Sequence, residues 1–251
     1  MKSILSLLAP LMMLASCHFG GDLSGVIDTR VIDAPGNYTE INIKGGVNVL
    51  LDPTATTITL TGDTVLIGAV TVNLKNGELS IDASRKLLRK RGIKIVSVKE
   101  EIVAPLSEKI DIVLPAPDIL SEINLAGAVN FTSTEPIKAN KLEINTAGAN
   151  NLTFTCDAKE LTVESAGADN YRVDGPVMEL DLTLAGACNF GSKDCCLTVN
   201  KAKVDLAGAC SATILSVGTV KGEAAGACSL LIGGAGDAKV KTRGASSVIR
   251  F

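Results

Sequence analysis

A short phrase, Ala-Gly-Ala, recurs along the second half of this 251-residue chain. Its copies are Ala126-Gly127-Ala128, Ala147-Gly148-Ala149, Ala166-Gly167-Ala168, Ala185-Gly186-Ala187, Ala207-Gly208-Ala209 and Ala225-Gly226-Ala227, followed by an altered copy, Arg243-Gly244-Ala245. Successive central glycines are 21, 19, 19, 22, 18 and 18 residues apart. A fixed period of about 20 residues is typical of one supersecondary unit stacked on itself, so we predict a solenoid.

The residues before each glycine alternate between apolar and polar. Ile123 and Leu125 flank Asn124, and the later repeats keep this order. A period of two indicates a strand with one buried face. A second short apolar stretch follows each glycine, and no segment long enough for a crossover helix separates the strands. Successive coils must therefore pair in parallel by winding, so we predict an all-β parallel β-helix with repeats of 18 to 22 residues, each holding two or three short strands.

The glycines predict a corner in every coil. Glycine adopts backbone conformations that a Cβ atom forbids, and it permits close approach of two backbones. The predicted corner glycines are Gly127, Gly148, Gly167, Gly186, Gly208, Gly226 and Gly244. The flanking alanines indicate a narrow place with room only for methyl groups. Aromatic residues make up 3% of the chain, without Trp, which fits a thin solenoid filled with Ala, Val, Leu and Ile.

Alignment on the glycine reveals a polar column three residues later. Its members are Asn130, Asn151, Asn170, Asn189, Ser211, Ser229 and Ser247. Strands stack about 4.8 Å apart, so these side chains can hydrogen-bond along the stack as a ladder. A catalytic role is the alternative, but catalysis needs unlike groups that meet at one point. We therefore interpret the column as a structural ladder.

One position earlier, three cysteines stack in consecutive coils, Cys188, Cys210 and Cys228. A soft-metal site there is conceivable, but it lacks a fourth ligand and any CxxC spacing. Cys156, Cys195 and Cys196 complete an even set of six that could form disulfides in an exported protein, although parallel Cβ vectors in neighbouring coils rarely suit the bond. We favour small thiols that fill a narrow column, and we predict no metal and no cofactor.

The N-terminus has the pattern of a lipoprotein signal peptide, residues 1–16. Lys2 precedes a short apolar core, and Leu14-Ala15-Ser16-Cys17 resembles a lipobox, which predicts that Cys17 becomes the diacylated N-terminus. The alternative is a secretory signal followed by an incidental cysteine. Residues 17–25 follow as a flexible tether; they contain His18, the only histidine, which we interpret as a linker residue rather than a metal ligand. No later segment is long and apolar enough to cross a bilayer.

Residues 26–251 form one predicted domain, with irregular capping coils over 26–120 and regular repeats over 121–251. The expected strands of the cap are Val26–Ile32, Glu40–Ile43, Val47–Leu51, Thr57–Leu60, Val70–Leu74, Leu79–Ile81, Ile93–Val98 and Ile110–Leu114. Lys75-Asn76-Gly77-Glu78 predicts a type I′ hairpin. Gly45-Gly46-Val47-Asn48 copies the later corner, which adds Asn48 to the ladder.

One segment is sharply basic, with Arg85, Lys86, Arg89, Lys90 and Arg91. It could bind a polyanion such as lipopolysaccharide phosphate or an acidic glycan. We favour a solvated loop or a single helical turn that is balanced by nearby glutamates.

Together, the lipobox, the Gly46-Val47-Asn48 match to a Gly-Ile-Asn signature and the repeated corners resemble one bacterial family. This is the putative auto-transporter adhesin head domain, or GIN domain, a domain of unknown function. The resemblance covers residues 27–251 and implies a parallel β-helix on an envelope lipoprotein, without established catalytic residues. The chain departs from the family pattern in its Ala-Gly-Ala corners, where Ser-Gly-Ala is common, and in its cysteine column.

We weigh three functions. The first is a non-enzymatic, lipid-anchored envelope protein whose flat faces bind an extended glycan or protein ligand, as an adhesin would. The second is a polysaccharide-active β-helix enzyme, but Asp169, Asp181 and Asp205 occupy ordinary repeat positions and sugar-stacking aromatic residues are scarce. The third is a periplasmic scaffold or sensor. Removal of residues 1–16 changes the formal net charge from −3 to −4, which argues against a nucleic-acid binder.

Two further features bear on partners and location. Five residues before each glycine, acidic side chains give way to lysines, from Glu122 and Glu143 to Lys221 and Lys239, which could aid head-to-tail contacts. We expect Asp205 and Glu223 to neutralise these lysines. His18 follows Cys17, and by common sorting rules a residue other than Asp there favours the outer membrane. The sequence does not decide between the cell surface and the periplasmic side of that membrane. The oligomeric state is open as well.

Overall fold

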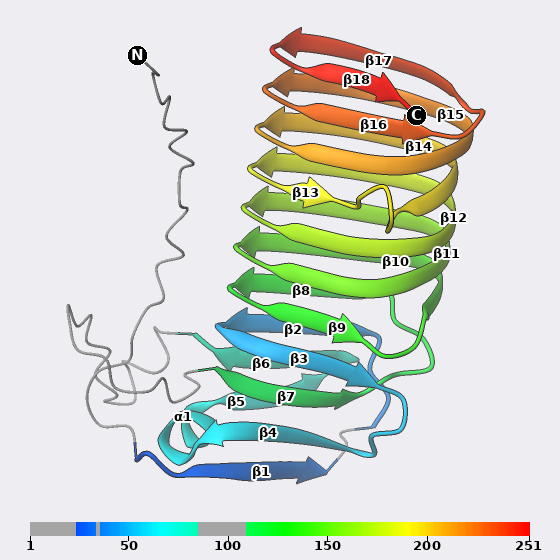
Figure 1. Ribbon diagram of the computed structural model, residues 1–251. Helices are drawn as coiled ribbons and strands as arrows, with labels where there is room; N and C mark the ends of the chain where they lie inside the picture. The colour runs from blue at the N-terminus through cyan, green and yellow to red at the C-terminus, as the bar shows by residue number, and fades with distance from the viewer. Residues whose placement is uncertain (1–23, 34–35, 85–108) are drawn as a thin grey trace, which may run out of the picture.

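Parallel coils stack along one axis in the computed structural model, which describes residues 24–33, 36–84 and 109–251 (Figure 1). The regular coils contain β8 (Glu122–Gly127), β9 (Asn130–Ser133), β10 (Ile137–Gly148), β11 (Asn151–Gly167), β12 (Asn170–Gly186), β13 (Asn189–Phe190), β14 (Leu197–Gly208), β15 (Ser211–Gly226), β16 (Ser229–Gly233), β17 (Asp237–Gly244) and β18 (Ser247–Arg250). Each coil pairs in parallel with the next, and the corner glycines are in register. The predicted parallel β-helix is confirmed.

The regular coils hold fewer and longer strands than we predicted. β11 and β12 each run for 17 residues from one corner to the next. Their register is kept across the bend between the two faces, because Thr155 pairs with Asp174 and Ala158 with Val177. The residues between these pairs, at the bend itself, are not paired with each other.

The corners bring glycine backbone onto glycine backbone. At Gly186, φ is +115°, and a Cβ atom placed there would lie 2.2 Å from the carbonyl oxygen of Gly167 in the preceding coil. The N–H of Ala187 donates to that same oxygen at 2.8 Å, and the other corners repeat the contact. The alanines do not mark a narrow interior as we expected: Ala187 is exposed, because the constriction is between backbones and the methyl groups point to solvent.

The core is a column of side chains enclosed by the coils. The inward residues before the corner are the predicted aliphatic ones, such as Ile123, Leu125 and Val204. Aromatic residues contribute more than their scarcity suggested: Phe131 packs edge-on against Phe154, and the rings of Tyr171 and Phe190 are 5.5 Å apart. These four rings are buried.

The N-terminal coils do not stack in chain order. They contain β1 (Ile27–Asp33), β2 (Glu40–Gly45), β3 (Val47–Asp52), β4 (Thr57–Asp63), α1 (Thr64–Ala69), β5 (Thr71–Lys75), β6 (Glu78–Ala83) and β7 (Ile110–Pro115). β2 pairs with β8 on one side and with β6 on the other, and β3 likewise lies between β9 and β7. The coil of β2 and β3 is therefore the first regular coil, and the chain later returns beneath it (Figure 1).

Antiparallel strands end the stack at this side. β4 pairs antiparallel with β7, β1 with β4, and β5 with β6. The β5–β6 turn is the predicted hairpin, because Asn76 and Gly77 both have positive φ, +55° and +82°. The expected strand Ile93–Val98 lies outside the described residues.

A short helix, α1, lies between β4 and β5, where we predicted no element. The carboxylate of Asp63 caps it by accepting from the Val65 N–H, and also accepts from the Gly25 N–H and the Ser24 hydroxyl. Burial alone raises the pKa of Asp63, but these hydrogen bonds hold it below its ordinary value. Within the described residues, no helix is long and apolar enough to span a membrane.

Replacement of a corner glycine by alanine tests the backbone contact. Gly186→Ala should lower the free energy of unfolding by at least about 2 kcal/mol, because the methyl group meets a carbonyl oxygen and the backbone conformation disfavours L-residues. Gly46→Ala is the control, because this glycine has open space around it and no positive φ. Chemical denaturation measures both, and equal stability of the two variants would contradict the account.

Candidate functional site

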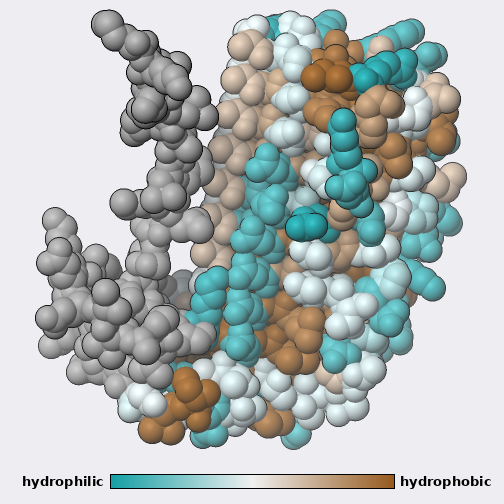
Figure 2. Space-filling model, viewed as in Figure 1, coloured by the Kyte–Doolittle hydropathy of each residue, from teal (hydrophilic) through white to brown (hydrophobic). Residues whose placement is uncertain are grey.

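The predicted polar column lies on the outside of the solenoid, on the face that follows each corner. We call this face the ladder face; its column comprises Asn48, Asn130, Asn151, Asn170, Asn189, Ser211, Ser229 and Ser247. Figure 2 shows hydrophilic side chains in a column along this face. The column is in register from β3 to β18.

Side-chain hydrogen bonds join the N-terminal members of the column. The Asn48 amide donates to Asp111 at 2.6 Å, Asn130 donates to Asn48 at 2.7 Å, and Asn151 donates to Asn130 at 2.9 Å. Asn170 and Asn189 continue the column in exposed positions. Among the described residues, no side-chain partner lies within hydrogen-bond distance of these two amides, so their groups are open to an external ligand.

The rest of the ladder face is flat and polar. Thr132, Thr153 and Arg172 form the next outward column and are all exposed. Hydroxyl, amide and guanidinium groups therefore lie on neighbouring coils of one rigid sheet. The strands of these coils are about 4.8 Å apart.

Two residues after each corner glycine, one side chain points inward, and Asn150, Asp169 and Ser246 at this position accept a hydrogen bond from a backbone N–H. The Asn150 Oδ1 atom accepts from the Val129 N–H in the coil below, and the Asp169 Oδ1 atom accepts from the Asn150 N–H at 2.7 Å. At the other end of the column, the Ser246 hydroxyl accepts from the Cys228 N–H. A buried N–H needs a partner, which accounts for the polar side chains at these three positions.

Asp169 is the centre of a buried polar cluster that sequence analysis missed. Its carboxylate also accepts from the side chains of Asn150, Thr146 and Ser165 at 2.7 to 2.8 Å. The Tyr171 hydroxyl contacts Thr146, and burial raises the pKa of Tyr171. The glycine alignment contained the signal, because it placed Asn150 and Asp169 in the same column as the cysteines.

The three stacked cysteines occupy this inward column. Cys188, Cys210 and Cys228 are buried, and each thiol donates to backbone carbonyl oxygens of the corner at 3.4 to 3.7 Å. The six cysteines within the described residues are free thiols. No group of three or more His, Cys, Asp or Glu residues in the described ranges has the geometry to hold a metal ion.

The face that precedes each corner carries the charged columns, and we call it the charged face. Five residues before the corner, its acidic side chains are Glu78, Glu40, Glu122, Glu143 and Asp181, and its basic ones are Lys203, Lys221 and Lys239. The acidic side chains lie on the N-terminal coils and the lysines on the C-terminal coils. Sign therefore changes once along the stack, between β12 and β14.

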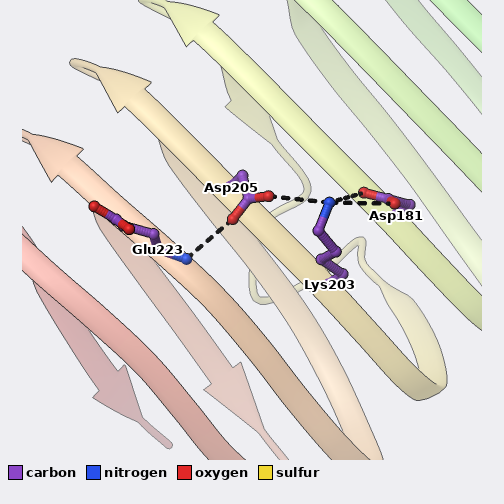
Figure 3. Close-up of polar contacts among 4 residues, drawn as sticks. All are labelled: Asp181, Lys203, Asp205 and Glu223. Carbon is purple, nitrogen blue, oxygen red and sulfur yellow. Dashed lines mark hydrogen bonds and ion pairs between the residues drawn. The ribbon is translucent and has the colours of Figure 1, made fainter.

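Ion pairs bridge that change of sign. Lys203 lies 3.4 Å from Asp181 and 3.1 Å from Asp205 (Figure 3). Lys201 lies 2.6 Å from Glu179. The hydrogen bond with Asp205 and the charge of Asp181 raise the pKa of Lys203.

Of the two acidic side chains that we expected to neutralise the lysines of this column, Asp205 does so and Glu223 does not. Asp205 pairs with Lys203 and also accepts from the Glu223 N–H at 3.1 Å (Figure 3). Glu223 pairs with Arg243 at 2.8 Å rather than with a lysine of its own column. Lys221 and Lys239 therefore have no carboxylate of the described residues within ion-pair distance.

Shallow, open hollows follow the charged face. The first, of about 620 Å³, is lined by residues that include Asn42, Asn124, Asn145, Glu143 and Glu164. The second, of about 400 Å³, lies over the change of sign.

The structure brings two of the three candidate carboxylates together, around Lys203, and separates the third from them. Asp169 lies inside the solenoid, whereas Asp181 and Asp205 lie outside and share Lys203. Cys17, His18 and the basic residues Arg85, Lys86, Arg89, Lys90 and Arg91 lie outside the described residues.

Residues 37–236 match a family described as putative auto-transporter adhesin, head GIN domain. The chain belongs to this family. The match starts just before β2, the first regular coil, and runs into the last one. No curated protein matches the chain.

Solved structures share the fold of this GIN-domain protein. A putative adhesin from Bacteroides fragilis is 16% identical, with a TM-score of 0.73 over 91% of this chain and 99% of that chain. A putative lipid binding protein from Parabacteroides distasonis is 18% identical, with a TM-score of 0.59 over 91% and 98%. A putative adhesin from Parabacteroides merdae is 17% identical, with a TM-score of 0.57 over 91% and 97%. At these identities, the likeness concerns the fold alone.

Thiol labelling tests the inward column. Burial and the charge of Asp157 raise the pKa of Cys156 to about 12, so at pH 9 its thiol stays protonated in the folded protein. Half-buried Cys195 should therefore react first with iodoacetamide, and Cys156, Cys188 and Cys210 should react only after unfolding. Peptide mass spectrometry measures each site, and rapid labelling of Cys188 in the folded protein would contradict its placement.

Proposed function

We propose that this chain is the non-enzymatic head of a lipid-anchored cell-envelope adhesin, and that its ladder face binds an extended glycan. One observation carries the proposal: exposed amides are in register on neighbouring coils of a flat, rigid sheet. An amide both donates and accepts hydrogen bonds, as sugar hydroxyls do. A polymer lying along the stack meets similar groups at regular intervals, so many weak contacts add up.

The other parts of the proposal have separate support. The lipobox at Cys17 supports a lipid anchor in the outer membrane, and the tether over residues 17–25 would hold the head away from the bilayer. Family membership supports a role in adhesion. The burial of Asp169 and the ion pairs of Asp181 and Asp205 support a non-enzymatic role, because paired carboxylates in a glycosidase must face one scissile bond.

Cys17→Ser tests the anchor. The thiol is the expected acyl acceptor, so the variant should move from the membrane fraction to the soluble fraction after cell lysis. Wild-type chain in the same fractionation is the control. Persistent membrane association of Cys17→Ser would overturn the lipid anchor.

The ladder is tested by glycan-array binding of the Cys17→Ser chain. Asn170→Ala/Asn189→Ala removes two exposed amides, each worth about 1 kcal/mol, so binding should weaken at least tenfold, by about 1.4 kcal/mol or more. Thr162→Ala/Thr183→Ala on the charged face is the matched control and should bind as the parent does. No glycan binding by the parent, or equal binding by both double variants, would overturn the ladder face as the glycan site. Selective capture of a protein by the parent would instead identify the ligand as a protein.

A further inference from the structure

The charged face is complementary to itself, and we infer that it pairs with the same face of a second copy, with the two solenoids antiparallel. The inference goes beyond the proposed function and does not depend on it, because the ladder face stays free in such a pair.

The N-terminal half of the charged face carries unpaired negative charge. Its acidic side chains on the outward columns are Glu40, Glu78, Asp82, Glu122, Glu143, Glu160 and Glu164, against Lys44 and Lys141. Among the described residues, no lysine or arginine lies within ion-pair distance of these carboxylates. Glu122 and Glu143 accept hydrogen bonds only from the neighbouring amides Asn124 and Asn145.

The C-terminal half carries unpaired positive charge. Lys221, Lys239 and Lys241 are exposed, and within the described residues no carboxylate lies within ion-pair distance of their ammonium groups. Of the acidic residues on this half, Asp205 and Glu223 are already paired with Lys203 and Arg243. Asp237 is the remaining acidic residue on this half.

A two-fold axis at the change of sign places the acidic half of one copy opposite the basic half of the other. With the axis between β12 and β14, β17 of one copy lies over β10 of the other, and β15 lies over β11. Five residues before the corner, Lys239 then faces Glu143, and Lys221 faces Thr162, which lies two residues from Glu164. A parallel arrangement would instead place like charges opposite each other, which disfavours it.

The surface is flat enough for close contact. One residue before each corner, the outward side chain is alanine on β10, β11, β12, β14 and β15, beside the glycines. The bulkier Arg243 has this position on β17, at the edge of the overlap, where it pairs with Glu223. Six overlapping strands about 4.8 Å apart and about 20 Å wide cover roughly 600 Å² per copy, which is at the lower limit for specific interfaces. We therefore expect a weak dimer that depends on concentration and salt.

Sedimentation velocity of the Cys17→Ser chain tests the inference. The parent should dimerise with rising concentration at low ionic strength, and it should be monomeric at about 1 M salt, where the Debye length is about 3 Å. Lys239→Glu/Lys241→Glu places acidic side chains opposite the acidic β10 of the other copy, and Glu143→Lys/Glu164→Lys places lysines on β10 and β11 opposite those of β17 and β15. Each variant alone should be monomeric, and an equimolar mixture of the two should form a heterodimer.

The control reverses two lysines away from the charged face. Lys138→Glu/Lys159→Glu changes the net charge as much as the first variant but lies at the bend, and it should dimerise like the parent. Circular dichroism and melting temperature establish that each variant is folded. A parent that is monomeric at every concentration, or a mixture that stays monomeric while both variants are folded, would overturn the inference. If the parent is monomeric but binds glycan, the dimer is wrong and the proposed function still holds.

Discussion

The close contact between corner backbones is the constraint on which the rest of this structure depends. At each corner, the alanine N–H donates to the glycine carbonyl oxygen of the coil below, at 2.7 to 2.9 Å. Only glycine leaves room for that oxygen, and only glycine tolerates the backbone angle readily. Because the corners are in register, every other position of the repeat is in register as well. The outer faces are continuous columns for this reason.

The corner also creates an electrostatic problem in the core. It turns a backbone N–H toward the interior, and in several coils a side chain of the next coil accepts from it. Asn150, Asp169 and Ser246 do so with oxygen atoms, and the cysteines occupy the same column with their thiols against corner carbonyls. The inward cysteines thus have a structural role in the corner, and their burial separates them from redox or metal chemistry at the surface.

Sequence analysis predicted the regular solenoid well, because the glycine spacing gives the repeat and the alternation gives the buried side. It could not predict the order of the N-terminal coils. Alternation in β2 and β6 shows which side chains point inward, but both strands fit equally well as neighbours of β8. Helix α1 was missed because six residues are too few for a helical periodicity to emerge, and the contact that supports it, from Asp63 to residues near Ser24, is distant in sequence.

The candidate site was predictable in position but not in detail. The glycine alignment located the ladder column, yet the sequence could not tell that Asn48, Asn130 and Asn151 are linked while Asn170 and Asn189 are open. Nor could it tell that Asp169 points inward and Asp181 outward, since both are aspartates near a corner. Whether a side chain points inward or outward depends on its position relative to the corner glycine. The backbone turn at the corner sets that direction.

Amide hydrogen exchange at the corner alanines tests the account most directly. Ala149, Ala168, Ala187 and Ala209 have exposed side chains, so without the corner contact their amides would exchange rapidly. The account predicts that these amides are protected as strongly as those of the buried residues Leu161 and Leu182 in the strands. Exchange as fast as at the exposed residues Lys193 and Asp194 would show that the corners are unpaired, and would contradict the backbone stacking from which the faces and the inward column follow.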